Sequence, residues 1–379
     1  MIVGLFPELL SAGGVQRAGR LTAAALAAFA DRRGESARFL SLNDAPQEST
    51  FQVGTGSIAF TGFGRSKARF LRTVWSLTRL KPDLIFALHP NLAPVVAAMK
   101  LAAPASRTLI FCHGIEVWTP LPFIRRTSLR RVDLILAPSA DTARRLETQQ
   151  GVPAEKIHRL AWSLGPEFNG SAASASAGGS LPEAFPHGRV ILTVGRWDAR
   201  EAYKGMDHLI SVMPGLMEMV PDLHLVAVGS GTDVPRLKRL AAESGVTGRI
   251  HFLSSLTHEQ LAAAYDACAV FALPSRGEGF GLVFLEAMAH GKPVIGGAHG
   301  GTPDVIDEGV TGYLVEYGNL AQLSDRLQRL LTDEASRCCM GARALEKVGR
   351  DFTFDRFSRN LEQAVGSLLA PPDVPAVVT

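Results

Sequence analysis

The chain alternates short runs of consecutive apolar residues with longer segments in which apolar residues recur every three or four positions. Runs of the first kind predict buried parallel strands, and segments of the second kind predict amphipathic helices. In the first half the two kinds of segment alternate, which is typical of βαβ units. The expected strands are residues 2–6, 37–42, 83–87, 108–112 and 134–137, and the first expected helix is 15–30.

A second series of apolar runs follows a segment of different composition. Between Gly165 and Gly188 the chain is rich in Gly, Ser and Ala with flanking prolines, which is typical of a linker. The expected strands beyond it are residues 190–194, 224–228, 250–252, 269–273, 293–295 and 313–315. The sequence therefore predicts an α/β protein with two doubly wound, Rossmann-like domains that face one another across a cleft. The predicted boundaries are 1–167 for the first domain, 168–187 for the linker, 188–350 for the second domain, and 351–379 for a C-terminal segment with a helix at about 354–369.

Composition supports two soluble domains. The chain has 379 residues, of which 46% are hydrophobic and 20% charged, and this is too long for one ordinary core. Its four cysteines include the adjacent pair Cys338 and Cys339 and no Cys-x-x-Cys, so neither a disulfide framework nor a zinc cluster is indicated. The N-terminus lacks a basic leader, and no apolar run is long enough to span a membrane. We therefore expect a cytoplasmic protein.

The net charge of +3 is small but unevenly distributed. Residues 49–82 contain six basic residues and no acidic one, and residues 117–132 contain four arginines. An anionic membrane surface is therefore one expected partner, with peripheral attachment at the inner face, whereas a solvated helix face explains the same pattern without any partner. We expect no nucleic-acid partner. The basic residues concerned are Arg65, Lys67, Arg69, Arg72, Arg79, Lys81, Arg125, Arg126, Arg130 and Arg131.

The segment 275–286 carries the strongest chemical signal. It follows the expected strand 269–273, contains a glycine-rich turn, and runs into an expected helix at 282–290. Gly279 and Gly281 allow an anion to approach the backbone, and the start of the helix presents unpaired N–H groups and positive potential. Glu278 lies in the turn and Glu286 about two turns along the helix, an arrangement better suited to sugar hydroxyls than to a metal.

This E-x(7)-E segment resembles the retaining glycosyltransferases of family 4, which have the GT-B architecture. The resemblance continues through Ala287-Met288-Ala289, the segments 291–295 and 300–304, and Gly312-Tyr313-Leu314-Val315. In the family Gly-Gly-x-x-Glu is commoner than the Gly-Gly-x-x-Asp found here, so the role of Asp304 is left open.

Two cations flank a turn after the first strand of the second half. Arg196 lies in Gly-Arg-Trp-Asp, and Lys204 precedes Gly205 and the next expected helix. The resemblance implies that both bind the donor diphosphate. A fixed guanidinium and ammonium would stabilise the charge of the leaving group without a metal. Each residue could instead form an ordinary surface ion pair.

In the first half the resemblance implies two further elements. Gly13 and Gly14 look like the family's glycine loop, which approaches the donor diphosphate, although a tight strand-to-helix turn would have the same residues. His113 follows a buried strand at the edge where ligands bind in open α/β sheets, and it resembles the histidine that contacts the transferred sugar. Without this resemblance, a single histidine at the end of a strand is more often a structural residue. Glu116 would orient His113, bind the acceptor or cap the next segment.

Gly229-Ser230-Gly231 follows another expected strand, but Val234 stands where a dinucleotide fingerprint has its third glycine. A nucleotide-side loop is therefore favoured over an NAD site. The residues that we predict to bind the donor are Gly13, Gly14, Arg196, Lys204, Gly229, Glu278, Gly279, Phe280, Gly281, Leu282, Val283 and Glu286, and those predicted to act in catalysis are His113, Glu278, Arg196 and Lys204.

The resemblance implies a retaining transfer of a hexose from a UDP- or GDP-sugar to a hydroxyl of a glycan or lipid-linked acceptor, in polysaccharide biosynthesis, with no metal and no other cofactor. Two alternatives stay open. One is a sugar-nucleotide 2-epimerase of the same architecture, and the other is a non-catalytic sugar-nucleotide-binding protein.

Overall fold

The computed structural model describes residues 1–11, 13–168 and 180–370. The chain divides into two compact units, one formed by Met1–Gly165 with the chain from Phe354 onward, and the other by Pro166–Thr353. Of the expected linker, residues 169–179 lie outside the described residues. The side chains of Phe168 and Phe185, on either side of them, are buried, so these parts of the expected linker pack against the protein.

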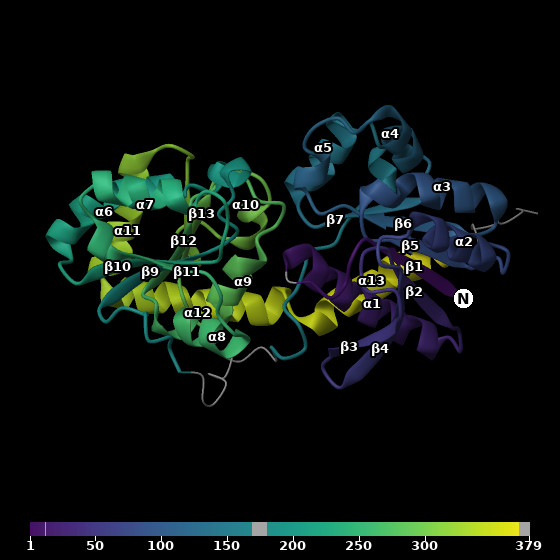
Figure 1. The fold of residues 1–379 in the computed structure, drawn as a ribbon, viewed down its shortest axis with the longest axis horizontal. Coiled ribbons are helices and arrows are strands. Elements are labelled where there is room, and N and C mark those ends of the chain that lie inside the picture. Colours follow the sequence, from purple (N-terminus) through teal and green to yellow (C-terminus); the bar gives the residue numbers. More distant parts are fainter. Residues whose placement is uncertain (12, 169–179, 371–379) are drawn as a thin grey trace, which may run out of the picture. The chain divides into compact units, whose positions relative to one another are not determined.

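The first unit is built around an eight-stranded sheet with the order β3-β4-β2-β1-β5-β6-β7-β8 (Figure 1). All neighbours in it pair in parallel except β3 and β4, which form an antiparallel hairpin. The expected strands of the first half are present to within a residue at each end, whereas the hairpin and β8 were not predicted. The strands are β1 Ile2–Phe6, β2 Ala37–Ser41, β3 Glu48–Val53, β4 Gly56–Gly62, β5 Leu84–Ala87, β6 Arg107–Phe111, β7 Leu134–Ala137 and β8 Ile157–Arg159.

Helices connect these strands, and their apolar stripes cover the sheet. Every residue of β1 and β5 is buried, as expected for parallel strands covered on both faces. The last helix, α13, returns to this unit, where it packs against α1 and Arg32 pairs with Glu362. The helices are α1 Gly14–Arg32, α2 Lys67–Thr78, α3 Ala93–Ala102, α4 Phe123–Arg130, α5 Ala140–Thr148 and α13 Phe354–Leu369, with short 3₁₀ turns η1 Pro90–Leu92, η2 Ile115–Val117 and η3 Ala154–Lys156.

The second unit has an entirely parallel six-stranded sheet with the order β11-β10-β9-β12-β13-β14. From β9 the chain proceeds outward through β10 and β11 and then returns to the other side of β9 with β12. The order therefore reverses between β9 and β12, which is where open α/β sheets bind ligands. The strands are β9 Arg189–Val194, β10 Leu223–Val228, β11 Ile250–Leu253, β12 Val270–Leu273, β13 Val294–Gly297 and β14 Gly312–Val315.

Helices lie on both faces of this second sheet (Figure 1), so the unit has the doubly wound architecture that the sequence predicts. The helices are η4 Ala199–Lys204, α6 Met206–Met219, α7 Val234–Glu243, η5 Thr247–Arg249, α8 His258–Ala267, α9 Leu282–Ala289, α10 Thr302–Val305, α11 Leu320–Thr332 and α12 Glu334–Asp351. In the described part of the chain, no helix combines the length and apolarity needed to cross a bilayer.

Candidate active site

Charged side chains gather at the carboxyl ends of β9 and β12, the two strands that flank the reversal of strand order. Arg196 follows β9, and Glu278 follows β12 in a turn before α9. Lys204 ends η4, the short helix between β9 and α6. Lys204 and Glu278, 74 residues apart in the sequence, therefore meet at the edge where ligand sites of this fold form.

Backbone contacts bring Lys204 to Glu278. The N–H of Arg276 donates to the carbonyl of Tyr203 over 2.7 Å, which joins the two loops just before their charged residues. Gly205 has a φ of 77°, and a Cβ there would lie 2.4 Å from the carbonyl oxygen of Pro274. Only glycine therefore allows η4 to turn into α6 at this close approach.

Lys204 and Glu278 form an ion pair that is mostly shielded from solvent. Lys204 Nζ donates to Glu278 Oε1 over 3.0 Å, and each side chain is 12% exposed. Burial by itself would lower the pKa of Lys204, but the charge and hydrogen bond of Glu278, together with Tyr203 and Glu201, leave this pKa above its ordinary value. Lys204 is therefore a permanent cation. Glu278 Oε2 has no hydrogen-bond partner among the described residues, so it is available to a ligand.

Glu201 extends this pair into a chain of four charges. Its carboxylate pairs through Oε1 with the guanidinium of Arg196 and lies, through Oε2, 3.8 Å from Lys204 Nζ. Arg196 is 69% exposed and Glu201 is 14% exposed, so a mostly shielded carboxylate, with Asp198 3.5 Å from Arg196 Nε, holds an arginine that extends into solvent. The order is Arg196, Glu201, Lys204, Glu278, and the net charge of the four groups is zero.

Glu201 was not predicted from the sequence. It lies in Ala199–Lys204, a segment without a strong helical or strand pattern, and its φ of −111° interrupts the 3₁₀ helix. A carboxylate between two predicted phosphate-binding cations was the signal that could have identified it.

The loop after β10 supports the segment that carries Arg196. The N–H of Trp197 donates to Ser230 O over 2.9 Å, and the N–H of Asp233 donates to Trp197 O over 2.8 Å. Gly229 has a φ of 121°, and a Cβ there would lie 1.9 Å from Gly195 O. Close backbone packing is thus a sufficient reason for glycine at this position, and contact of Gly229 with the donor stays a prediction.

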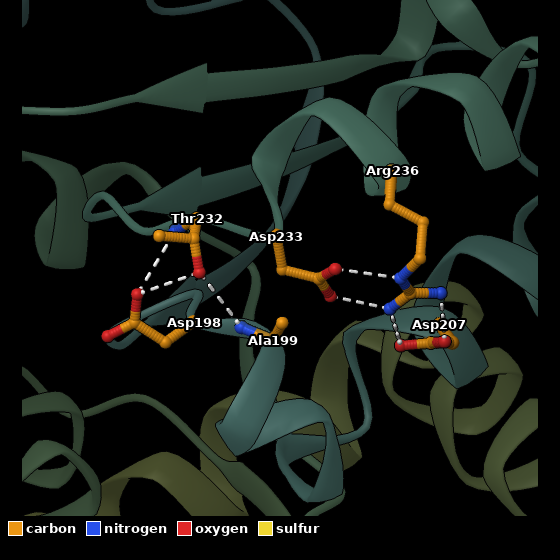
Figure 2. A network of polar contacts seen from close by, with 6 residues as sticks. All are labelled: Asp198, Ala199, Asp207, Thr232, Asp233 and Arg236. Atoms are coloured by element: carbon orange, nitrogen blue, oxygen red, sulfur yellow. Dashed lines mark hydrogen bonds and ion pairs between the residues drawn. The ribbon is translucent and has the colours of Figure 1, made fainter.

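A network of side chains reinforces the same support (Figure 2). The hydroxyl of Thr232 donates to Asp198 over 3.2 Å and accepts from the N–H of Ala199 over 3.2 Å. Arg236 on α7 bonds Asp233 beside it and also Asp207 in the first turn of α6, at 2.7 and 2.8 Å. Burial by itself would raise the pKa of Asp207, but the hydrogen bonds and charge of Arg236, with smaller contributions from its own backbone and His208, lower it overall. The η4 segment is therefore fixed at both ends.

Two glycines after β13 hold the backbone of Glu278. The N–H of Gly301 donates to Glu278 O over 2.7 Å, and Gly300 forms a bridge with Glu278. A Cβ at Gly301 would lie 2.3 Å from Gly279 O. The Gly-Gly pair therefore acts through backbone packing. Asp304 lies in α10, where its N–H donates to Gly301 O, and the role of its side chain stays open.

The turn into α9 presents backbone rather than side chains. Phe280 and Leu282 are buried, and the ring of Phe280 packs against Phe352. Gly281 has a φ of 101° and precedes α9, whose first turn carries no acidic residue. The first N–H groups of the helix, at Leu282 and Val283, suit an anion. The backbone contacts predicted for Gly279 through Val283 are consistent with this arrangement and stay predictions.

Glu286 lies farther along α9, where it is half-buried. The hydroxyl of Tyr265 on α8 donates to Glu286 Oε2 over 2.9 Å. Tyr265 is a second residue that sequence reasoning did not identify, because nothing in a helix of alternating small and polar residues marks a hydrogen bond to another helix.

In the first unit, His113 lies just beyond β6 and is buried. Its Nε2 is 2.5 Å from the carbonyl of Leu88, which assigns the proton to Nε2 and leaves Nδ1 as an acceptor without a partner among the described residues. The ring stacks on Phe111 and contacts Trp162. Burial lowers the pKa of His113 to about 4, so the ring is neutral at pH 7.

The side chain of Glu116 accepts a hydrogen bond from the backbone N–H of His113 over 2.5 Å. This contact holds the backbone of the His113 segment, and acceptor binding by Glu116 stays a prediction. His89, after β5, lies with its ring 6.2 Å from that of His113, and burial lowers its pKa also to about 4.

Gly13 and Gly14 lie where the chain enters α1. Gly13 has a φ of 151° and precedes the helix, which starts at Gly14. Earlier in the chain, Asp44 accepts from the N–H of Leu9 over 2.7 Å, which holds the backbone at Leu9. Gly13, Gly14 and His113 belong to the first unit, and their roles toward the donor stay predictions. Among the described residues, no group of three His, Cys, Asp or Glu side chains could hold a metal ion.

Comparison with known proteins relates both units to glycosyltransferases. The family model Glycosyltransferase Family 4 matches residues 12–161, and the model Glycosyl transferases group 1 matches residues 183–347. A GDP-mannose-dependent alpha-(1-6)-phosphatidylinositol monomannoside mannosyltransferase from Mycobacterium tuberculosis is 30% identical over 305 residues, 77% of this chain and 74% of that protein. The enzyme of the same name from Mycolicibacterium smegmatis is 32% identical, over 70% of each chain.

Solved structures show the same fold. HepE of Anabaena, in complex with UDP, superposes with a TM-score of 0.75 at 19% identity, over 97% of this chain and 99% of that one. Sucrose-phosphate synthase from Thermosynechococcus elongatus superposes with a TM-score of 0.73 at 22% identity, over 97% and 98%. The chain is thus a nucleotide-sugar glycosyltransferase of GT-B architecture, and it belongs to glycosyltransferase family 4.

Proposed function

We propose that this chain is a retaining hexosyltransferase that transfers mannose from GDP-mannose to a hydroxyl of a lipid-linked glycan acceptor. The observation that carries the proposal is the ion pair of Lys204 and Glu278, joined through Glu201 to Arg196 at the reversal of strand order. The choice of GDP-mannose and a lipid-linked acceptor is supported by the printed names of the two mycobacterial relatives. UDP-sugars and soluble glycans are the competing substrates.

The cations give the site its electrostatic function. When the glycosidic bond breaks, the nucleoside diphosphate leaves with an added negative charge. Lys204, kept protonated by Glu278, and Arg196, held by Glu201, stabilise that charge from fixed positions. The N–H groups at the start of α9 add a backbone contribution. Glu286 binds the ribose hydroxyls.

Glu278 acts on the sugar. Its Oε1 is held by Lys204, so the carboxylate has a fixed orientation before the donor arrives. Oε2 then accepts a sugar hydroxyl, and the negative charge stabilises the positive charge that develops at the anomeric carbon. The acceptor attacks the face that the diphosphate leaves, and a donor phosphate oxygen takes its proton, so the anomeric configuration is retained without a protein nucleophile.

We also propose that transfer requires no divalent metal, because Arg196 and Lys204 supply positive charge where a metal would otherwise be needed. The measurement is the initial rate before and after treatment with a chelator. An unchanged rate supports the proposal, and loss of activity that magnesium or manganese restores would contradict it.

The central test is a donor screen followed by product analysis. Thermal shift with GDP, UDP and ADP should show stabilisation by GDP above the others, because a ligand that binds only the folded state raises the melting temperature. Incubation with GDP-mannose and a lipid-linked acceptor should give an α-linked product by NMR. Stabilisation by UDP alone would replace the proposed donor, and an inverted product would contradict retention.

The same products distinguish the alternatives. A 2-epimerase would consume a sugar nucleotide and release an epimerised sugar without an acceptor. A non-catalytic binding protein would be stabilised by the nucleotide but would convert neither the sugar nucleotide nor the acceptor. The complete set of charged groups in the second unit favours transfer over binding alone.

Attachment to an anionic membrane is the proposed localisation, and the first unit carries a suitable surface. On α2, Leu71 and Trp75 lie one turn apart and are both about half exposed, at 48% and 49%, with Arg72 and Arg79 on the same stripe. On α4, Phe123 and Ile124 are 74% and 68% exposed and are followed by two arginines. Mixed apolar and basic faces of this kind bind membrane interfaces.

Salt-dependent binding to vesicles tests this localisation. Each basic residue near an anionic bilayer contributes on the order of 1 kcal/mol, so several suffice. The protein should float with phosphatidylglycerol vesicles at low salt, and Phe123→Ser with Ile124→Ser should weaken flotation while Leu320→Ser, on the second unit, leaves it unchanged. Absence of flotation at low salt would leave a solvated helix face as the explanation.

A further inference from the structure

The hydroxyl of Tyr265 fixes one oxygen of Glu286. Tyr265 lies in the last turn of α8, is 2% exposed, and donates to Glu286 Oε2 over 2.9 Å. A hydrogen bond to a charged carboxylate is stronger than one between neutral groups. The bond therefore selects one rotamer for a side chain that is half-buried on α9.

A second set of contacts holds the phenol ring itself. His290 follows Glu286 by one helical turn, and its ring stacks on Tyr265 at 5.5 Å and 20°. His290 Nδ1 lies 2.7 Å from Asp266, the residue after Tyr265, and Lys292 Nζ donates to Asp266 O over 2.7 Å. The end of α8 is thus joined to α9 at two successive turns. Rotation of the Tyr265 side chain would break both its hydrogen bond to Glu286 and its stacking on His290.

We propose that Tyr265 is a positioning residue for donor binding, which orients Glu286 toward the two ribose hydroxyls of the nucleotide. The inference rests on the ribose role of Glu286 in the proposed function. A carboxylate already held in one orientation loses less conformational freedom when the ribose binds. Removal of the Tyr265 hydroxyl should therefore weaken recognition of the ribose and leave the chemistry at the sugar unchanged.

The test compares Tyr265→Phe with the wild type by calorimetry, using GDP and 2′-deoxy-GDP as probes. The variant keeps the ring that packs against Phe271 and His290, so it should fold. GDP should bind three- to tenfold more weakly, the preference for GDP over 2′-deoxy-GDP should shrink by the same factor, and kcat should change less than twofold. Glu286→Gln should show the same pattern more strongly, and the double variant should add nothing to it.

Two controls separate this role from general destabilisation. Tyr313→Phe removes a hydroxyl from a ring that lies against Arg326. This variant should change neither the affinity for GDP nor the preference for GDP over 2′-deoxy-GDP. Asp266→Asn weakens the contact with His290 without touching Glu286, so it should affect ribose discrimination less than Tyr265→Phe does. An equal or larger effect would show that helix packing matters rather than the hydroxyl, and would overturn the role of Tyr265.

The outcomes also separate this inference from the proposed function. If Glu286→Gln reduces ribose discrimination and Tyr265→Phe does not, the positioning role is wrong and the proposed function stands. If Glu286→Gln leaves ribose discrimination intact, the ribose assignment is wrong and the inference fails with it. If the wild type binds none of GDP, UDP or ADP, the proposed function itself is wrong.

Discussion

At the carboxyl edge of the second sheet, Lys204 and Glu278 form a shielded ion pair, whereas at the corresponding edge of the first sheet the buried group is the neutral ring of His113. Both edges belong to sheets in which the central strands are parallel. Lys204 keeps its charge because the acidic groups around it, with Glu278 the strongest, together outweigh burial. His113 loses its charge because burial among aromatic rings outweighs its hydrogen bond to the Leu88 carbonyl, which by itself would raise the pKa of the ring.

The difference shows how one fold provides two kinds of chemistry. A charge can remain in a shielded place only if opposite charges lie within a few ångströms, and Glu201 and Glu278 provide them. Such a cluster suits a diphosphate. A neutral histidine supplies a hydrogen-bond acceptor that does not change near pH 7, which suits a sugar hydroxyl. Substitutions in the charged cluster of the second unit and at His113 in the first unit test this difference.

The largest expected effect follows from removal of the cation that the cluster is built around. Lys204→Met keeps much of the apolar part of the side chain but leaves Glu278 and Glu201 without the cation between them. We expect kcat/KM to fall about 10³-fold, roughly 4 kcal/mol, as for loss of one preorganised electrostatic group. Steady-state kinetics measures this, with the exposed Lys238→Met as the matched control. A loss of less than tenfold would show that the cluster is structural.

The two glutamates of the E-x(7)-E segment should differ when each is changed to Gln. Glu278→Gln should lower kcat about 10²-fold with little change in nucleoside diphosphate affinity, because it acts on charge at the anomeric carbon. Glu286→Gln should raise the donor KM more than it lowers kcat, because a ribose contact is similar in ground and transition states. Kinetics with calorimetry separates the two. If Glu278→Gln abolished nucleotide binding and spared turnover, the assignment would be reversed.

On the first unit, acid should destabilise the fold through His113. Its pKa is about 4 in the folded protein and about 6.5 when unfolded, so between these values the unfolded chain binds more protons, and stability falls as pH decreases. From pH 7 to pH 5 the wild type should lose about 2 kcal/mol more than His113→Phe. Burial is the main cause of the lowered pKa of His89 and acts in both proteins, so most of the contribution of His89 cancels. Denaturant titrations at the two pH values measure this, and equal losses would mean that His113 is charged when folded.

The smallest expected effect concerns Glu201. Glu201→Gln keeps the shape of the side chain but removes the charge that holds Arg196, so donor affinity should fall about tenfold, or about 1.4 kcal/mol. Calorimetry with the nucleoside diphosphate measures it, and Asp325→Asn, at an exposed ion pair with Arg329, is the control. Tighter binding would instead show that Glu201 competes with the diphosphate.

Local pattern in the sequence was enough for most of the strands and for the final helix. Buried parallel strands read as continuous apolar runs, and the helix at 354–369 has the bounds expected of it. The hairpin Glu48–Gly62 was missed because the strand prediction relied on continuous apolar runs, and these half-exposed strands contain few consecutive apolar residues. The linker interpretation followed from composition, which does not reveal that Phe185 is buried.

The sequence by itself determined the family, the two-domain α/β fold, and the candidate charged residues at the ends of strands, because these depend on local pattern and spacing. Only the tertiary structure decided which charges meet. Glu201 between Arg196 and Lys204, Tyr265 on Glu286 and Leu88 on His113 are contacts across turns and between elements. Such contacts depend on backbone paths through loops, where a glycine such as Gly205 permits an approach of a few ångströms. Periodicity along one element carries no information about the element packed against it.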